Sequence, residues 1–163
     1  MAAYVGETVA DAEGRFELPA AEGGATRVFV TGGGCPLASF DVQPSAEELS
    51  LRCPEVPASL ALQFEDKQGH PVAGRSVFAR KDGVIIPNEV LIRHLGRFNL
   101  PAAADGGGRL FLVGLAPGSY DLFLVEATFP ELVAQGSQQG FLTAATLSPF
   151  STTELQITLE TGP

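Results

Sequence analysis

The residues of this chain that could do chemistry are few and lie far apart in the sequence. His70 and His94 are the only histidines. A metal site would require them to converge with a carboxylate such as Glu65 or Glu89, and their spacing matches no metal-ligand motif. We therefore expect His70 to be a turn residue. We expect His94 to lie at the surface or to have its hydrogen bonds satisfied.

Three other patterns associated with catalysis or ion binding are incomplete. The glycine run at 32–34 is similar to a phosphate-binding loop, but no Lys-Ser/Thr pair and no predicted helix follows it. Cys35 would need a neighbouring base to act as a nucleophile, and Pro36 adjoins it instead. The acidic pairs at 47–48 and 65–66 lack the alternating aspartates of a calcium loop. The sequence predicts no catalytic residue, no metal and no cofactor.

The two cysteines carry more information than the histidines. Cys35 and Cys53 are 18 positions apart, and each is followed by proline. Residues 37–42 and 48–51 are expected to form two antiparallel strands, and this hairpin would bring the cysteines together. We therefore expect a disulfide, with free structural thiols as the alternative. A disulfide would indicate the periplasm, the cell surface or the extracellular medium.

Composition limits the class of protein further. The chain is 45% hydrophobic and contains 19 glycines and 12 prolines, which is typical of many short strands joined by turns. The net charge of −9 argues against a nucleic-acid partner. No apolar run is long enough for a membrane span. Residues 1–20 lack a basic start and an apolar core, so we expect no signal peptide there.

One local pattern occurs twice and predicts two β-sandwich units. An acidic turn and a strand at 11–18 lead to a strand at 26–31. A similar turn and strand at 105–113 lead to a strand at 120–125. The prolines at 54 and 57 mark a linker. We expect an incomplete first unit in residues 1–57 and a complete second unit in residues 58–163.

The second unit contains further predicted strands at 59–64, 75–80, 84–86 and 152–159. Residues 89–95 could be a strand or a short helix, because their apolar spacing fits both. Residues 129–150 are expected to be a long connection, since they are mostly small and polar.

Three sequence segments carry a family resemblance, namely those at 66–77, 105–112 and 114–122. They resemble turns and strands of the carboxypeptidase regulatory-like domain, a prealbumin-like (transthyretin-like) Greek-key β-sandwich. The resemblance extends over residues 58–160. The first unit resembles only the later part of the same domain and lacks its opening strand. The resemblance therefore implies an all-β fold of tandem prealbumin-like units.

The resemblance also implies a function without catalysis. Such domains are usually accessory parts of exported proteins. One enzymatic relative, hydroxyisourate hydrolase, ends in a Tyr-Arg-Gly-Ser motif that this sequence does not contain. We expect a non-catalytic structural or protein-interaction module of a larger exported bacterial-type protein, bound to other domains of that protein or to another chain.

Two alternatives concern the surface of the protein. A carbohydrate- or peptide-binding module would use the loops expected at 84–104 and 127–150. Phe129, Phe141 and Phe150 would form an interaction patch if they were exposed together. The missing strand of the first unit would leave an open sheet edge. We expect the second unit to cover that edge, or another molecule to cover it by strand addition, forming an oligomer.

Overall fold

The chain folds into two compact units. We describe a computed structural model in which the described residues are 6–19, 24, 26–32, 34–43, 48–54, 56–127, 133 and 138–160. The first unit consists of Met1–Phe29 and Ser39–Arg52, and the second of Val30–Ala38 and Cys53–Pro163. The sequence placed residues 30–38 in the first unit, whereas they group with the second. The chain thus enters the second unit, returns to the first, and crosses again at Cys53.

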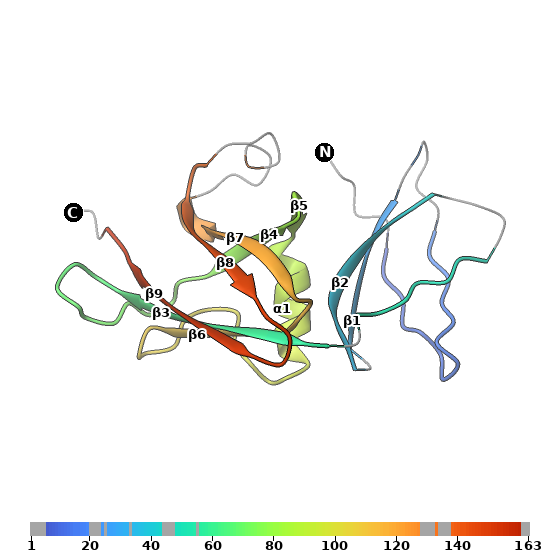
Figure 1. The fold of residues 1–163 in the computed structure, drawn as a ribbon, viewed down its shortest axis with the longest axis horizontal. Helices are drawn as coiled ribbons and strands as arrows, with labels where there is room; N and C mark the ends of the chain where they lie inside the picture. Colours follow the sequence, from blue (N-terminus) through green and yellow to red (C-terminus); the bar gives the residue numbers. More distant parts are fainter. Residues whose placement is uncertain are drawn as a thin grey trace. The chain divides into compact units, whose positions relative to one another are not determined.

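The structure has the predicted all-β class, with two sheets (Figure 1). The elements are β1 (Thr26–Gly32), β2 (Cys35–Val42), β3 (Ala58–Glu65), β4 (Val77–Lys81), β5 (Val84–Ile86), α1 (Asn88–Gly96), β6 (Arg109–Leu115), β7 (Gly118–Leu124), the short 3₁₀ helix η1 (Val125–Ala127), β8 (Phe141–Leu147) and β9 (Thr152–Thr158). One sheet has the order β1-β2-β6-β3-β9, and the other β5-β4-β7-β8. In the described part of the chain, no helix is long and apolar enough to cross a membrane.

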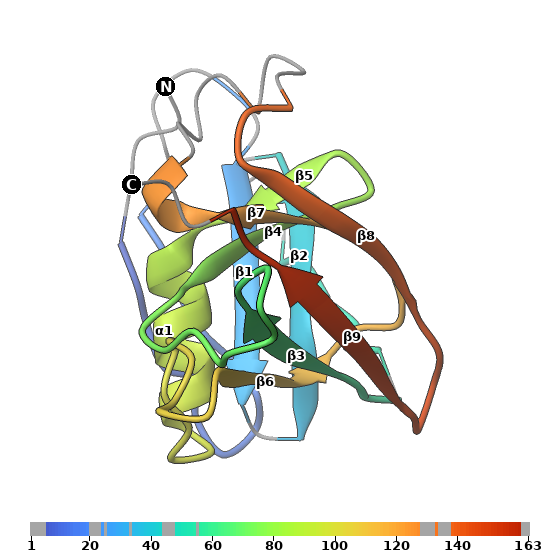
Figure 2. The ribbon, with the colours of Figure 1, turned by 90° about the vertical axis from the view of Figure 1, so that its left-hand side faces the viewer.

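Strand β3 is the centre of the second unit. It pairs antiparallel with β6 on one side and parallel with β9 on the other. Its alternating residues Ala58, Leu60, Leu62 and Phe64 are at most 2% exposed. Because strand side chains alternate between faces, this pattern buries one whole face of β3. That face meets the β4-β7-β8 sheet, and Figure 2 shows α1 beside the two sheets.

The segment whose type the sequence left open, 89–95, is helical. Leu91, His94 and Leu95 of α1 are buried. These positions follow the i, i+3, i+4 spacing that places side chains on one helix face. Pro87 precedes the helix, where its fixed φ angle is compatible with a helix start.

Strand β8 corrects the expectation of a long connection at 129–150. Phe141–Leu147 pairs antiparallel with β7 along most of its length. Its only buried residues are Ala145 and Leu147, and the rest of the strand is partly or fully exposed. An edge strand with two alanines and two threonines has a weak alternation of apolar residues, which hid it in the sequence. The segment at 84–104, offered as a binding loop, contains β5, which confirms the strand predicted at 84–86, and the helix α1.

The first unit differs from its expected form. Residues 15–18 and 48–51 form no strand, so the predicted hairpin between the cysteines is wrong. Only parts of β1 and β2 are strands among the unit's described residues, and none of those residues is buried. Without a facing layer, segments 15–18 and 48–51 have little apolar area to bury, and strand pairing there gains little stability.

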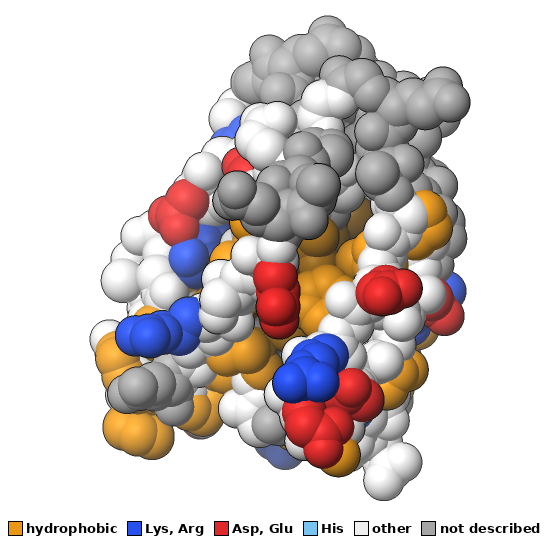
Figure 3. All heavy atoms as spheres, turned by 90° about the vertical axis from the view of Figure 1, so that its right-hand side faces the viewer, with side chains coloured by type: hydrophobic (Ala, Val, Ile, Leu, Met, Phe, Trp, Pro, Cys, Tyr) orange, Lys and Arg blue, Asp and Glu red, His pale blue; other side chains and the backbone are white. Residues whose placement is uncertain are grey.

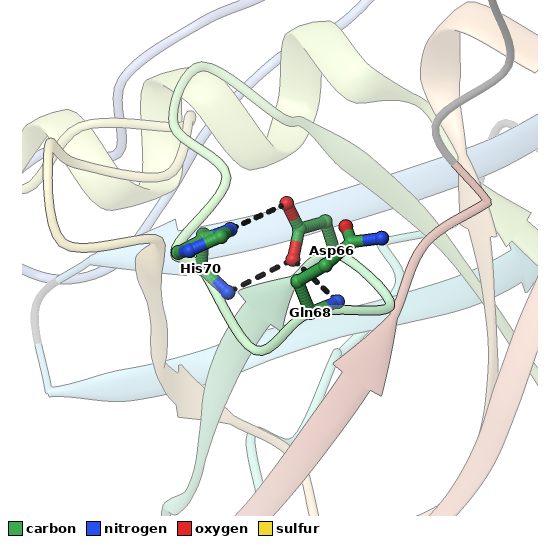
Figure 4. Close-up of polar contacts among 3 residues, drawn as sticks. All are labelled: Asp66, Gln68 and His70. Atoms are coloured by element: carbon green, nitrogen blue, oxygen red, sulfur yellow. Dashed lines mark hydrogen bonds and ion pairs between the residues drawn. The ribbon is translucent and has the colours of Figure 1, made fainter.

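The turn that repeats in the sequence has the same hydrogen bonds in each copy, and the described residues contain three copies of it. In each copy an aspartate Oδ1 accepts the backbone N–H groups two and four residues later, at 2.8–3.0 Å. In each copy a glycine N–H also donates to the aspartate carbonyl. The copies begin at Asp11, Asp66 and Asp105. Figure 4 shows the Asp66 copy, in which the His70 ring also contacts the carboxylate.

The third copy of the turn lies against strand β3. The Phe64 N–H donates to the Gly108 carbonyl at 2.8 Å. A Cβ on Gly108 would lie 2.4 Å from the Phe64 carbonyl oxygen, and its φ is +75°. Gly69 holds the same turn position with φ +82° and has nothing within 4 Å of such a Cβ. Only at Gly108 is the missing side chain needed for close approach as well as for the positive φ.

These two glycines give a matched test of the turn. Gly69→Ala should destabilise the protein by about 1 kcal/mol, because only the left-handed backbone is strained. Gly108→Ala should destabilise it by about 3 kcal/mol, because a backbone collision is added. Urea unfolding of both variants measures the difference. Equal losses would contradict the close approach of this turn to β3.

Candidate functional site

The candidate chemical residues are not brought together. Within the described ranges, no group of three or more His, Cys, Asp or Glu side chains is placed to hold a metal ion. His70 lies in the exposed turn after β3, and its ring pairs with Asp66. Three hydrogen bonds to Asp66, the largest contribution coming from the His70 N–H, lower the pKa of its carboxyl group. This arrangement stabilises a turn and leaves the carboxylate occupied.

His94 is the one buried polar residue among those the structure describes, and both of its ring nitrogens have partners. Nε2 donates to the Val113 carbonyl oxygen at 2.7 Å. Nδ1 is hydrogen-bonded to the Thr31 hydroxyl. A neutral imidazole with its proton on Nε2 satisfies both contacts, since the Thr31 hydroxyl can donate to Nδ1. His94 therefore has the satisfied structural role expected from the sequence.

Burial lowers the pKa of His94, because desolvation disfavours the charged ring. The nearby Arg97 lowers it further, while the hydrogen bonds to the Val113 and Gly114 backbone act in the opposite direction. The Phe98 ring packs edge-on against the imidazole at 5.3 Å between centroids. The fold thus prefers the neutral ring.

The depressed pKa of His94 predicts that acid destabilises the second unit. A histidine binds a proton more readily in the unfolded chain, whose pKa is about 6.5, than in the folded protein. The contribution of His94 to the free energy of unfolding should therefore be complete well above pH 6.5 and should be lost as the pH falls through about 6.5 toward the lower pKa of the folded state. Urea midpoints across this range measure the loss. His94→Gln should give a flatter profile, and an unchanged slope would contradict the prediction.

The structure joins Cys35 and Cys53 in a disulfide, with 5.5 Å between their Cα atoms. Cys35 begins β2, and Cys53 is the residue at which the chain finally re-enters the second unit. The bridge therefore joins the two ends of the loop that contains Ser39–Arg52 of the first unit. In the chain-entropy model a loop of this length contributes about 3 kcal/mol.

Two of the three aromatic residues proposed as an interaction patch, Phe141 and Phe150, lie in the described part of the chain. Phe129 lies outside the described residues. Phe141 is 41% exposed at the start of β8 and packs edge-on against Phe123, at 5.7 Å between centroids. Phe150 is 81% exposed and lies beyond the other end of β8. Since β8 separates Phe141 from Phe150, these two rings do not form a continuous surface.

A shallow hollow of about 350 Å³ lies where β7 and β9 end and β8 begins. Its lining residues are Arg75, Leu124, Glu126, Gly140, Phe141, Leu142, Leu159 and Glu160. The Nε of Arg75 is buried and has no hydrogen-bond partner in the part of the chain that the structure describes. The unpaired Nε–H of Arg75 could donate a hydrogen bond to a carbonyl or hydroxyl oxygen of a ligand, beside the apolar side chains of the lining.

The first unit presents apolar side chains to solvent. Val9, Phe16 and Leu49 are 84%, 39% and 52% exposed. In Figure 3 a hollow with a hydrophobic floor is flanked by acidic and basic side chains. A unit with exposed apolar side chains and no buried residue among those described is a candidate binding surface. Sequence reasoning pointed to this region through its missing opening strand.

Comparison with known proteins gives likenesses of structure alone. No protein-family model matches the chain, and no curated protein matches it. The similar solved structures include the minor pilin of Streptococcus agalactiae, with 18% identity and a TM-score of 0.47 over 78% of this chain and 65% of that one.

Two further solved structures are similar over most of the chain. The major pilin subunit of Bacillus cereus has 12% identity and a TM-score of 0.41, over 83% of this chain and 37% of its own. The 5-hydroxyisourate hydrolase of Klebsiella pneumoniae has 15% identity and a TM-score of 0.38, over 65% of this chain and 92% of its own. This chain thus spans 65% and 37% of the lengths of the two pilins.

Proposed function

We propose that this chain is a non-catalytic structural or protein-interaction module of a larger exported bacterial-type protein. Its second unit would be a carboxypeptidase regulatory-like domain, and its first unit an incomplete copy of the same domain. Its partners would be other domains of the parent protein or another polypeptide, and it would use no cofactor.

The strongest support for this proposal is that His94, the two cysteines and the aspartates of the turns all make contacts that stabilise the fold. Both nitrogens of His94 are hydrogen-bonded, and the two cysteines are bridged. The aspartates of the three turns each accept two backbone N–H groups. A general base or nucleophile has to be available to a substrate, and these groups are engaged.

The disulfide supports the exported location. Disulfides persist in oxidising compartments and are rare in reducing ones. The bridge joins the two ends of the loop that contains Ser39–Arg52 of the first unit, and none of that unit's described residues is buried.

A second candidate function is favoured by the hollow at Arg75. A carbohydrate or peptide oxygen could accept the unpaired Nε proton while apolar groups pack on Phe141 and Leu142. This site includes residues of the segment 127–150, although a strand rather than a loop supplies them. Glu126 and Glu160 line the same hollow and would disfavour an anionic ligand.

Photo-crosslinking within the parent protein, in the organism that encodes it, tests the proposed module. A benzoylphenylalanine replaces Phe16 or Leu49 in the first unit, or Phe98 or Phe111 in the second. We expect adducts with one defined polypeptide or domain, and a Cys35–Cys53 bridge that resists alkylation until it is reduced. Purified chain should not accelerate 5-hydroxyisourate hydrolysis.

The contrary outcomes are separable. Alkylation of both cysteines in intact cells would contradict export. Turnover of 5-hydroxyisourate would contradict the absence of catalysis. Absence of any protein adduct from all four positions would contradict an interaction module.

A further inference from the structure

Phe150 combines a strained backbone with an exposed aromatic ring. It lies in the turn of residues 148–151 that joins β8 to β9, and its φ is +54°. Every other described residue with a positive φ is a glycine, an aspartate or an asparagine. A bulky side chain is rare in this conformation, because its Cβ crowds the backbone. The ring is nevertheless 81% exposed, so burial within the chain does not offset the strain.

Hydrogen bonds hold the turn of Phe150 in place. The Phe150 N–H donates to the Pro57 carbonyl oxygen at 2.9 Å. The Ser59 N–H donates to the Ser151 carbonyl oxygen at 3.0 Å. The Ser151 hydroxyl also donates to the Ser148 carbonyl oxygen at 2.8 Å. A turn that is already ordered loses little conformational entropy on binding, so its aromatic ring is suited to anchor an interface.

The hollow at Arg75 lies at the other end of the same two strands. Figure 2 shows the turn between the end of β8 and the start of β9. The hollow lies where β8 begins and β9 ends. Strand β8 has seven residues, so it separates the ring from the hollow by about 20 Å. Phe150 therefore cannot fill the hollow of its own chain.

The lining of the hollow favours an uncharged aromatic occupant. Phe141 and Leu142 supply apolar side chains. The buried Nε of Arg75 has no hydrogen-bond partner in the described part of the chain. An arginine attracts the face of an aromatic ring, and its N–H groups donate to carbonyl oxygens. Glu126 and Glu160 of the lining repel an anion, and Arg75 repels a cation.

The turn of Phe150 meets these requirements. Its sequence is Ser-Pro-Phe-Ser, without a charged residue. The hollow of about 350 Å³ is at the small end of the range for ligand sites, so it suits one ring rather than a longer segment. The turn also brings backbone carbonyl oxygens, which can accept the Arg75 Nε–H. One chain thus carries both halves of a contact, at opposite ends of two strands of its second unit.

We propose that Phe150 of one molecule inserts into the Arg75 hollow of a second copy of this chain. The ring packs on Phe141 and Leu142 of that copy, and a carbonyl oxygen of the turn accepts the Arg75 Nε–H. Because the ring and the hollow lie at different places on the molecule, the contact is heterologous and can repeat from copy to copy. This inference rests on the proposed interaction function and identifies the partner as the chain itself.

Sedimentation equilibrium of the purified full chain measures this association. A contact centred on one ring is smaller than a standard interface, so we expect a dissociation constant of about 0.1–1 mM. Phe150→Asn should weaken the association at least about tenfold, because it removes the ring while asparagine accepts the positive φ. Phe111→Thr is the matched control, since it removes a ring that is 42% exposed on β6, and it should leave the association unchanged.

Mixing two variants tests the direction of the contact. Leu142→Asp places a charge in the hollow and keeps the ring, whereas Phe150→Asn keeps the hollow, so each variant alone should stay monomeric. Unlabelled Leu142→Asp added to isotope-labelled Phe150→Asn should restore a 1:1 complex, with NMR shifts at the amides of Leu124, Gly140 and Leu142. If Leu142→Asp does not fold, the unaltered chain supplies the ring in the same titration.

Every other outcome overturns the proposal. A chain that stays monomeric up to about 1 mM would mean that Phe150 does not anchor a second copy. Equal association of the unaltered chain and Phe150→Asn, or dimers that grow no further, would mean a different interface. Shifts away from the hollow in the mixed titration would place the ring elsewhere. If the chain does not associate while crosslinks to a different polypeptide are found, this inference fails and the proposed module function stands.

Discussion

The pairing of β3 with β6 and β9 is the interaction on which the second unit depends. This central strand buries Leu60, Leu62 and Phe64 against the opposite sheet, and fully burying such side chains gives about 1.5–3 kcal/mol each. The Asp105 turn secures one end of the pairing through the Phe64–Gly108 hydrogen bond. The first unit has the same turn at Asp11 but no counterpart of β3 among its described residues. That absence explains why none of those residues is buried.

The two units therefore share the aspartate turn and differ in how much of their described chain is buried. An aspartate turn needs only five residues and forms without a core, because its hydrogen bonds are local. A sandwich needs two facing apolar layers, and a single two-stranded hairpin is marginally stable in water. The Cys35–Cys53 bridge constrains the part of the described chain with the least burial, because it closes the loop that contains Ser39–Arg52.

Sequence reasoning succeeded where local chemistry decides and failed where tertiary contacts decide. The repeated aspartate turns and β3 were readable because their residues impose a backbone geometry or a clear alternation. Strand β8 was missed, because pairing with β7 rather than alternation of large apolar residues defines it. The helical state of α1 depends on burial of Leu91 and Leu95, which the sequence does not show. The structural role of His94 depends on Thr31 and Val113, which are distant in sequence.

The central claim is that the described residues of the first unit form no buried core, whereas the second unit has one. Native-state hydrogen exchange of the isolated, oxidised chain measures this directly, because amides report the free energy of the opening that exposes them. The account predicts that the amides of Thr26–Phe29 and Ser39–Val42 exchange through local opening of small free energy. The amides of Leu60–Phe64 and Leu110–Leu112 should exchange only at the free energy of global unfolding of the second unit. Equal protection in both sets would contradict it.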